Sequence, residues 1–314
     1  MKVGIIGALN LDFIIRGEAP LEIEKLTTWG GISEVSCIVA GSVGYLSQNF
    51  KKLDCEVNLV SCITDDAFGT MIISSLNKIG ISTDNLLIEP DKISAIGIYM
   101  LLFGSSKRPI TYRLPTHHGW PPHISEQQKN ALLSSDLLHC GGYLHFSDLW
   151  YDELPKLYRE AKEAGKLTSL DPQFPLEDLS PPWSKVLEPM LQSTDVLFLD
   201  ENEAKGVTGT ESREDAISKL KGYKVPIIIV KMGEKGATLI SQGQEIHQPA
   251  IPSFQFVDSI GAGDSFDTGF LYSYKKTEDL KKSLEFAAHV ASKSCEGVGG
   301  TSRFPSYKDV QSLF

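Results

Sequence analysis

Short runs of apolar residues recur along the chain, and most of them show little alternation between apolar and polar positions. Such runs are typical of strands that are buried on both faces of a sheet. The pattern predicts six buried strands, at residues 3–6, 57–62, 137–140, 167–170, 196–199 and 227–230.

Helical patterns lie between these runs. One helix is predicted to bury a face made of Val43, Leu46, Phe50 and Leu53. A second is predicted to end at Gly165 and to bury a face made of Leu154, Leu157, Tyr158, Ala161 and Ala164. Strands that alternate with helices predict an α/β fold with a doubly wound, mostly parallel sheet flanked by helices. In such sheets ligands bind beyond the carboxyl ends of the strands.

Two segments depart from this alternation, at residues 13–39 and 95–114. Both contain short β-rich pieces, and Gly104-Ser105-Ser106 suggests a hairpin turn in the second. We expect the two segments to form a small β-sheet beside an α/β core built from residues 1–12, 40–94 and 115–314. The alternative is that they are ordinary edge strands of the main sheet.

The motif that carries the most chemical information lies after the last predicted strand, at residues 257–270, VDSIGAGDSFDTGF. The glycines of Gly261-Ala262-Gly263 allow a turn whose backbone amides point at one spot, and the helix that follows adds its positive end there. This arrangement predicts an anion site. Asp264 lies where a bound phosphate would repel it, unless it serves as a base for an attacking hydroxyl.

Three other interpretations apply to a glycine-rich motif of this kind. A purely structural glycine turn is common. A dinucleotide-binding fingerprint is disfavoured, because Phe266 replaces the third glycine and the motif lies near the end of the chain. A Walker A loop is excluded because no Gly-Lys-Ser or Gly-Lys-Thr follows at the required spacing.

Composition narrows the choice of function class. The chain has 314 residues, 41% hydrophobic and 22% charged, as in ordinary globular proteins. Its net charge of −10 argues against nucleic acid or an anionic membrane as a general partner. The five cysteines contain no C-x-x-C, so neither a disulfide framework nor a zinc site is indicated. Because the first apolar run is too short to span a membrane, we expect a cytoplasmic protein.

Residues 258–266, DSIGAGDSF, resemble the D-T-x-G-A-G-D-x-F signature of the ribokinase-like (phosphofructokinase B-type) carbohydrate kinases. Ser259 takes the place of the usual threonine. Further segments match the family in the expected order along nearly the whole chain, at residues 7–12, 40–42, 64–69, 171–172, 200–203, 231–236 and the final helix through residue 295.

The resemblance implies roles for the residues of the signature. Asp264 corresponds to the catalytic base that deprotonates a substrate hydroxyl as it attacks the γ-phosphate of ATP. Gly261, Ala262 and Gly263 correspond to the anion hole, which uses backbone amides. For Asp264 the alternative is a carboxylate that only caps the helix.

Asp200-Glu201-Asn202-Glu203 stands in the place of the family's Asn-x-x-Glu. The resemblance assigns Glu203 to the shell of Mg²⁺, and Asp200 is a weaker second candidate because aspartate replaces the asparagine. Aspartate can still bind hydrated magnesium, but it cannot donate a hydrogen bond to a phosphate. From composition alone, this segment would be an exposed loop.

Nucleotide contacts are implied at positions of lower specificity. Lys231-Met232-Gly233 stands where the family often has Thr-x-Gly, and Gly236 follows as expected. His289 stands in the last helix, where an asparagine often lies near the adenine. A structural glycine turn and a structural histidine are the alternatives.

The acceptor end of the site is implied near the first strand. Asn10 and Asp12 correspond to the family's Asn-x-Asp, in which the aspartate accepts hydrogen bonds from sugar hydroxyls; a simple turn is the alternative. Gly41 and Ser42 would let the backbone approach the same ligand. Tyr45 departs from the family, which usually has asparagine there in members that bind a simple sugar. A tyrosine can stack on a ring or shorten the pocket.

Taken together, the resemblance implies an ATP- and Mg²⁺-dependent kinase that phosphorylates an alcohol group of a sugar or sugar-like small molecule. Ribose, fructose, a keto-sugar acid, a nucleoside and an inositol all stay open as acceptors. The resemblance also implies that the small β-sheet of residues 13–39 and 95–114 is a lid that closes over the site and excludes water. A monovalent cation is a further candidate cofactor, and a homodimer through this lid is a candidate assembly. The alternative function is a catalytically silent metabolite sensor or scaffold.

Overall fold

The computed structural model describes residues 1–31, 33–102, 110–114, 123–175 and 178–314. Its strands are β1 (Lys2–Gly7), β2 (Asn10–Gly17), β3 (Ser33–Ala40), β4 (Glu56–Thr64), β5 (Leu86–Glu89), β6 (Ile96–Leu101), β7 (Ile110–Leu114), β8 (Leu137–Gly141), β9 (Leu167–Asp171), β10 (Val196–Asp200), β11 (Ile227–Lys231), β12 (Ala237–Ser241) and β13 (Gln244–Gln248). Its helices are α1 (Ile23–Leu26), α2 (Gly44–Lys52), α3 (Ala67–Lys78), α4 (Glu126–Leu133), α5 (Glu153–Glu163), α6 (Ser184–Leu191), α7 (Glu201–Thr208), α8 (Arg213–Leu220), α9 (Ala262–Thr277), α10 (Leu280–Ser294) and α11 (Tyr307–Val310).

The main sheet has the strand order β13-β12-β11-β10-β9-β8-β1-β4-β5. In this spatial order, the strands from β11 through β1 to β5 pair in parallel, and β12 and β13 add an antiparallel edge. All six strands predicted from apolar runs are confirmed, and so is the mostly parallel sheet. The order in which strands are added to the sheet changes direction at β1, because β4 and β5 lie on one side of it and β8 to β13 lie on the other.

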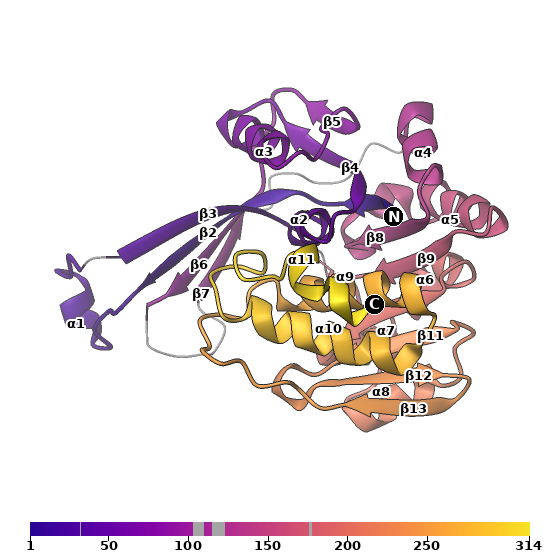
Figure 1. Ribbon diagram of the computed structural model, residues 1–314. Helices are drawn as coiled ribbons and strands as arrows, with labels where there is room; N and C mark the ends of the chain where they lie inside the picture. The colour runs from indigo at the N-terminus through magenta and orange to yellow at the C-terminus, as the bar shows by residue number, and fades with distance from the viewer. Residues whose placement is uncertain (32, 103–109, 115–122, 176–177) are drawn as a thin grey trace.

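Helices cover both faces of this sheet, which gives the fold two hydrophobic cores (Figure 1). The neighbours Ile5 and Ile6 of β1 point into opposite cores because side chains alternate along a strand. Leu46 of α2 and Phe270 of α9 pack in the first core, and Leu157 of α5 packs in the second.

Both helices predicted from periodicity are present as α2 and α5. Val43, Leu46, Phe50 and Leu53 are buried as expected. Ala164 is exposed, contrary to the prediction, because it is the C-cap of α5 and lies beyond the last buried turn. Gly165 follows with φ of 71°, a left-handed conformation that ends the helix.

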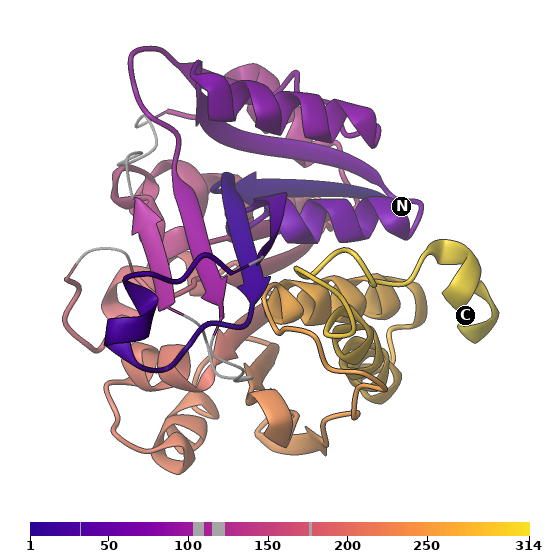
Figure 2. The ribbon, with the colours of Figure 1, turned by 90° about the vertical axis from the view of Figure 1, so that its left-hand side faces the viewer.

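A separate small sheet has the order β3-β2-β6-β7 and projects from the α/β core, with α1 at its far end (Figure 1). Figure 2 views the molecule from the side of this sheet. The edge-strand alternative is therefore wrong. The sheet begins at Asn10, which pairs with Ala40, so it starts three residues earlier than the segment boundary expected at residue 13. The turn expected at residues 104–106 lies outside the described residues.

Within the described ranges, no helix combines the length and the apolar character that crossing a bilayer requires.

Candidate active site

The first turn of α9 presents the predicted anion site. Gly261 is its N-cap and has φ of 73°, a conformation that glycine adopts without strain. The turn leaves little room, because a Cβ on Gly261 would lie 2.8 Å from the Cα of Gly300 and 3.0 Å from Cγ of Tyr45. Gly263 is exposed, so the end of the helix is open to a ligand.

The three amides of the predicted anion hole are not equivalent. The amide of Ala262 donates a hydrogen bond of 3.2 Å to the carbonyl of Ser259. Over the ranges that the structure covers, the amides of Gly261 and Gly263 donate to no protein acceptor. The positive end of α9 is therefore presented mainly by these two glycines.

Asp264 lies one residue further along this turn and is only partly buried. Burial raises the pKa of its carboxyl to about 7. The charge of Lys231 acts in the opposite direction, whereas the negative charges of Asp171 and Asp12 raise the pKa further. A carboxyl of this kind changes its protonation state near neutral pH, as a general base requires.

Asp12 lies on β2, in the small sheet, and is buried. Its two oxygens accept hydrogen bonds of 2.7 Å from Nδ2 of Asn10 and from the hydroxyl of Tyr45. Burial, followed by the charge of Asp12, raises the pKa of Tyr45 well above its ordinary value. Since the charge of Asp264 also acts on Tyr45, the predicted acceptor site and the predicted base are close neighbours.

The turn at Gly41 and Ser42 connects the small sheet to α2. Gly41 has φ of 93°, and a Cβ there would lie 2.4 Å from the carbonyl oxygen of Ala8. The buried hydroxyl of Ser42 accepts a hydrogen bond of 2.8 Å from the amide of Ala8 and donates one of 2.7 Å to the carbonyl of Gly141. Ser42 therefore links the strand ends below the predicted site, a structural contact that its sequence position did not suggest.

Asp200 and Glu203 form a capping box at the start of α7. Oδ1 of Asp200 accepts from the amide of Glu203 over 2.8 Å, and Oε2 of Glu203 accepts from the amide of Asp200 over 2.6 Å. Burial, with the charges of Asp171 and Asp200, raises the pKa of Glu203 well above its ordinary value. The expected exposed loop is thus a helix start that holds two carboxyl groups together.

The predicted nucleotide positions lie at the end of β11, in the turn after it and on α10. Gly233 and Gly236 form the turn after β11, with φ of 57° and 88°. His289 is exposed on α10. Lys231 points into the protein, where its ammonium contacts Oδ2 of Asp171 at 2.8 Å and both carboxylate oxygens of Asp267 at 3.0 Å.

Three further residues support the site and were not assigned a role from the sequence. Asp258 accepts hydrogen bonds from the amides of Ile260 and Gly299, over 2.9 and 3.0 Å, and so shapes the glycine turn. Asp171 and Asp267 hold Lys231. The sequence carried a signal for each of them: Asp258 opens the family signature, Asp171 lies in a matching segment, and Asp267 follows Asp264 by one helical turn.

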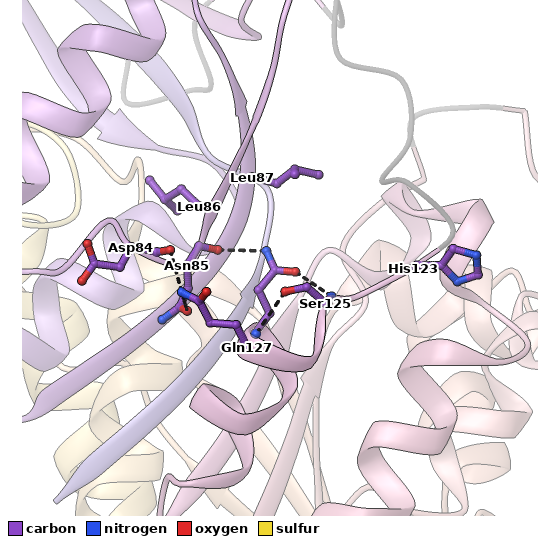
Figure 3. A pocket seen from close by; sticks show the side chains of 8 residues that line it. Asp84, Asn85, Leu86, Leu87, His123, Ser125 and Gln127 are labelled. Carbon is purple, nitrogen blue, oxygen red and sulfur yellow. Dashed lines mark hydrogen bonds between the residues drawn. The ribbon is translucent and has the colours of Figure 1, made fainter.

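A hollow of about 270 Å³ lies elsewhere, between β5 and the start of α4 (Figure 3). Nε2 of Gln127 donates to the carbonyl of Asp84 over 3.2 Å, and Nε2 of Gln128 donates to the carbonyl of Asn85 over 3.0 Å. None of the predicted site residues lines it. The hollow is therefore not part of the candidate active site.

Comparisons with known proteins identify the family of the chain. The sequence profile of the pfkB family carbohydrate kinases matches residues 5–306. Ribokinase of Arabidopsis thaliana is 25% identical over 323 aligned positions, which cover 98% of this chain and 80% of the relative. For 2-dehydro-3-deoxygluconokinase of Thermoproteus tenax the identity is 25% over 312 positions, which cover 96% and 94%.

The fold is similar to that of solved ribokinases. The structure of Arabidopsis thaliana ribokinase complexed with ribose and ATP has a TM-score of 0.78 and 22% identity, over 99% of this chain and 98% of that one. The small sheet beside a mostly parallel, helix-flanked sheet is therefore a ribokinase-like fold. With the family profile matching almost from end to end, the chain belongs to the pfkB family of carbohydrate kinases, phosphotransferases that act on a hydroxyl acceptor.

Proposed function

We propose that this protein transfers the γ-phosphoryl group of ATP to a hydroxyl group of a sugar or sugar-like small molecule. The observation that carries the proposal is the position of Asp264, whose pKa is about 7, at the open end of α9. A base with a pKa near the working pH is ionised before the reaction and can still take a proton during it.

Asp264 and Asp12 would have different roles toward the acceptor. Asp12 would accept hydrogen bonds from the acceptor's hydroxyl groups, and Asp264 would receive the proton of the hydroxyl that attacks phosphorus. Their electrostatic coupling supports this arrangement, because the charge of Asp12 is one of the causes that raise the pKa of Asp264. An acceptor held by Asp12 would therefore present its hydroxyl to Asp264.

The amides of Gly261 and Gly263 would stabilise the negative charge of the transferring group. Their geometry is fixed by the turn before the group arrives, which is the condition for effective electrostatic stabilisation. The amide of Ala262 already has the carbonyl of Ser259 as an acceptor. We therefore infer that the two glycine amides carry most of this role.

Asp200 and Glu203 fit a magnesium site of the hydrated kind. Both supply carboxyl oxygens from one helix start, and binding of Mg²⁺, which prefers carboxylate ligands, would release the proton that burial favours on Glu203. In the part of the chain that the structure describes, no group of three or more His, Cys, Asp or Glu residues would hold a metal alone. Water and ATP phosphate oxygens would complete the shell, and the ion would neutralise phosphate charge.

Tyr45 supports a compact acceptor. Its ring is buried, its hydroxyl is bonded to Asp12, and its Cε1 lies 3.5 Å from the position of a Cβ on Gly299. A ring packed in this way has no free face on which a sugar or base could stack. We infer that Tyr45 shortens the pocket, which favours a small sugar or polyol over a nucleoside.

ADP release measured with a panel of sugars, sugar acids, polyols and nucleosides tests the proposal. We expect turnover with at least one compact acceptor, and Asp264→Asn should lower that turnover by about 100-fold or more. Asp279→Asn, which changes the N-cap aspartate of the next helix, is the control and should retain turnover. Ligands that raise the melting temperature while none releases ADP would favour the silent sensor instead.

The small sheet would serve as the lid and as the surface of a homodimer. Its far end exposes the large apolar side chains of Leu21, Ile23 and Val35, each more than half accessible. Burying such side chains against a second copy would be favourable. Leu21→Glu with Ile23→Glu should lower the mass measured by sedimentation from that of a dimer to that of a monomer, and an unchanged mass would contradict this interface.

A further inference from the structure

Lys231 is the last residue of β11 and lies inside the protein, with its side chain 14% exposed. Its ammonium is held by Asp171 at the end of β9 and by Asp267 on α9, whose side chains are 7% and 1% exposed. The three residues come from three different elements. They form one ionic connection between the ends of β9 and β11, which lie on either side of β10, and the helix that carries the anion hole.

This ammonium also lies directly behind the anion hole. A Cβ on Gly263 would have the Nζ of Lys231 as its neighbour, at 3.5 Å. On its other side the ammonium faces the ring of Phe198, whose centroid is 5.6 Å away. A positive charge in this place adds to the positive end of α9.

We propose that Lys231 is a positioning residue of the phosphoryl-transfer site, whose ammonium fixes the first turn of α9 and supplies a permanent positive charge behind the anion hole. This inference rests on the proposed function, because it concerns the reaction that Asp264 and the glycine amides would perform. It replaces the direct nucleotide contact that the sequence suggested for Lys231.

A purely structural ion pair is the competing explanation, and its energetics do not favour it. Burying a charged pair costs several kcal/mol of desolvation per ion, and well-packed apolar residues are often at least as stabilising. One ammonium here contacts the carboxyl groups of Asp171 and Asp267, and its charge also acts on those of Glu203 and Asp264. A charge retained at such a cost is explained better by what it does to its neighbours.

The neighbour that matters for the reaction is Asp264. The charged groups that act on its carboxyl are Lys231 from β11, Asp171 from β9 and Asp12 from β2. The charge of Asp264 in turn helps to raise the pKa of Tyr45 on α2. Among the charged groups that act on Asp264, Lys231 alone favours the ionised carboxylate. Without the ammonium, Asp264 should hold its proton to higher pH.

Titration of Asp264 by NMR tests this directly. The protein is labelled with ¹³C in its aspartate carboxyl groups, and the Asp264 signal is assigned by its loss in Asp264→Asn. In Lys231→Met the apparent pKa of Asp264 should rise by about one unit or more, the usual effect of removing a nearby opposite charge. In Lys231→Arg, which keeps the charge, it should stay close to the value of the unaltered protein.

If a folded Lys231→Met variant titrates like the unaltered protein, the electrostatic role is wrong. Should this variant not fold, Lys231→Met combined with Asp267→Asn removes both sides of the pair. Asp267 is not among the charged groups that act on the carboxyl of Asp264, so the same rise at Asp264 is expected in the double variant. An unshifted titration in the double variant would overturn the proposal equally.

The titration needs neither ATP nor an acceptor, so it separates this inference from the proposed function. A rise at Asp264 in a protein that phosphorylates nothing would support the electrostatic effect of Lys231 on Asp264 and reject the kinase reaction. Where an acceptor is found, the acid limb of kcat/KM in Lys231→Met should move to higher pH by the same amount as the titration. A turnover loss of equal size at every pH would instead indicate a structural role alone.

Discussion

The hydroxyl of Tyr45 donates a hydrogen bond of 2.7 Å to Oδ2 of Asp12, and the two residues come from α2 and the small sheet. The bond therefore ties the predicted lid to the core at the point where an acceptor would be held. Cγ of Tyr45 also lies 3.0 Å from the position that a Cβ on Gly261 would take. One side chain thus contacts both the acceptor site and the anion hole.

Replacing Tyr45 by phenylalanine removes only this bond. The buried carboxylate of Asp12 then loses a donor, and hydrogen bonds to charged groups contribute about 1.5–3 kcal/mol. We expect the free energy of unfolding, measured by urea denaturation, to fall by about 2 kcal/mol. Tyr151→Phe, at a residue that is 68% exposed, is the control and should be neutral. Equal stability of the two variants would show that the bond contributes nothing.

Replacing Tyr45 by asparagine should change the choice of acceptor. The smaller side chain opens space between Asp12 and the Gly261 turn and offers an amide that can donate and accept hydrogen bonds. KM should then fall for bulkier sugars or nucleosides relative to the compact acceptor. Steady-state kinetics on the same panel measure the ratio, and an unchanged ratio would contradict the role of Tyr45 in shortening the pocket.

The parts of the fold that the sequence predicted are those with a local signal. Strand β11 reads as an apolar run because its first four residues are buried on both faces of the sheet. Strand β13 escaped prediction because its residues are mostly polar and exposed at the sheet edge. Asn10 and Asp12 looked like a turn, since their strand is completed only by pairing with Ala40 and Ile38.

The same distinction between local signals and tertiary contacts applies to the residues of the candidate site. Gly261, Gly263 and Asp264 belong to one contiguous motif, so their proximity follows from the sequence alone. The contacts of Lys231 join residues 60 and 36 positions away, and no local pattern predicts such pairs. The bond between Tyr45 and Asp12 is likewise a tertiary contact. The sequence alone therefore could not decide whether Tyr45 stacks on a ligand ring or shortens the pocket.

Gly261→Ala should disrupt the site through both strain and collision. Its φ of 73° is costly for alanine, and the new Cβ would lie 2.8 Å from Gly300. We expect the loss of turnover to be accompanied by a stability loss of several kcal/mol in urea denaturation. Gly243→Ala is the matched control, because its φ is 75° but nothing lies within 4 Å of its Cβ. It should cost only the strain of about 1 kcal/mol, and equal losses would argue against the close contact at Gly261.

Asp264 should also make the stability of the protein depend on pH. Its pKa is raised from 3.8 to about 7, mainly by burial, so between these values the folded state binds more protons than the unfolded state. Stability from this group is therefore fully present below about pH 4 and is lost as the pH rises to about 7.

Asp264→Asn removes this dependence, so the variant should gain stability over the unaltered protein as the pH rises. The shift of about three units, at about 1.4 kcal/mol each, sets an upper limit of about 4 kcal/mol at pH 8. Urea denaturation of both proteins at pH 5, 6.5 and 8 measures the difference. A difference that stays constant over this range would mean that the carboxyl is not desolvated in the folded protein, and Asp264 would then lack the property on which its role as a base depends.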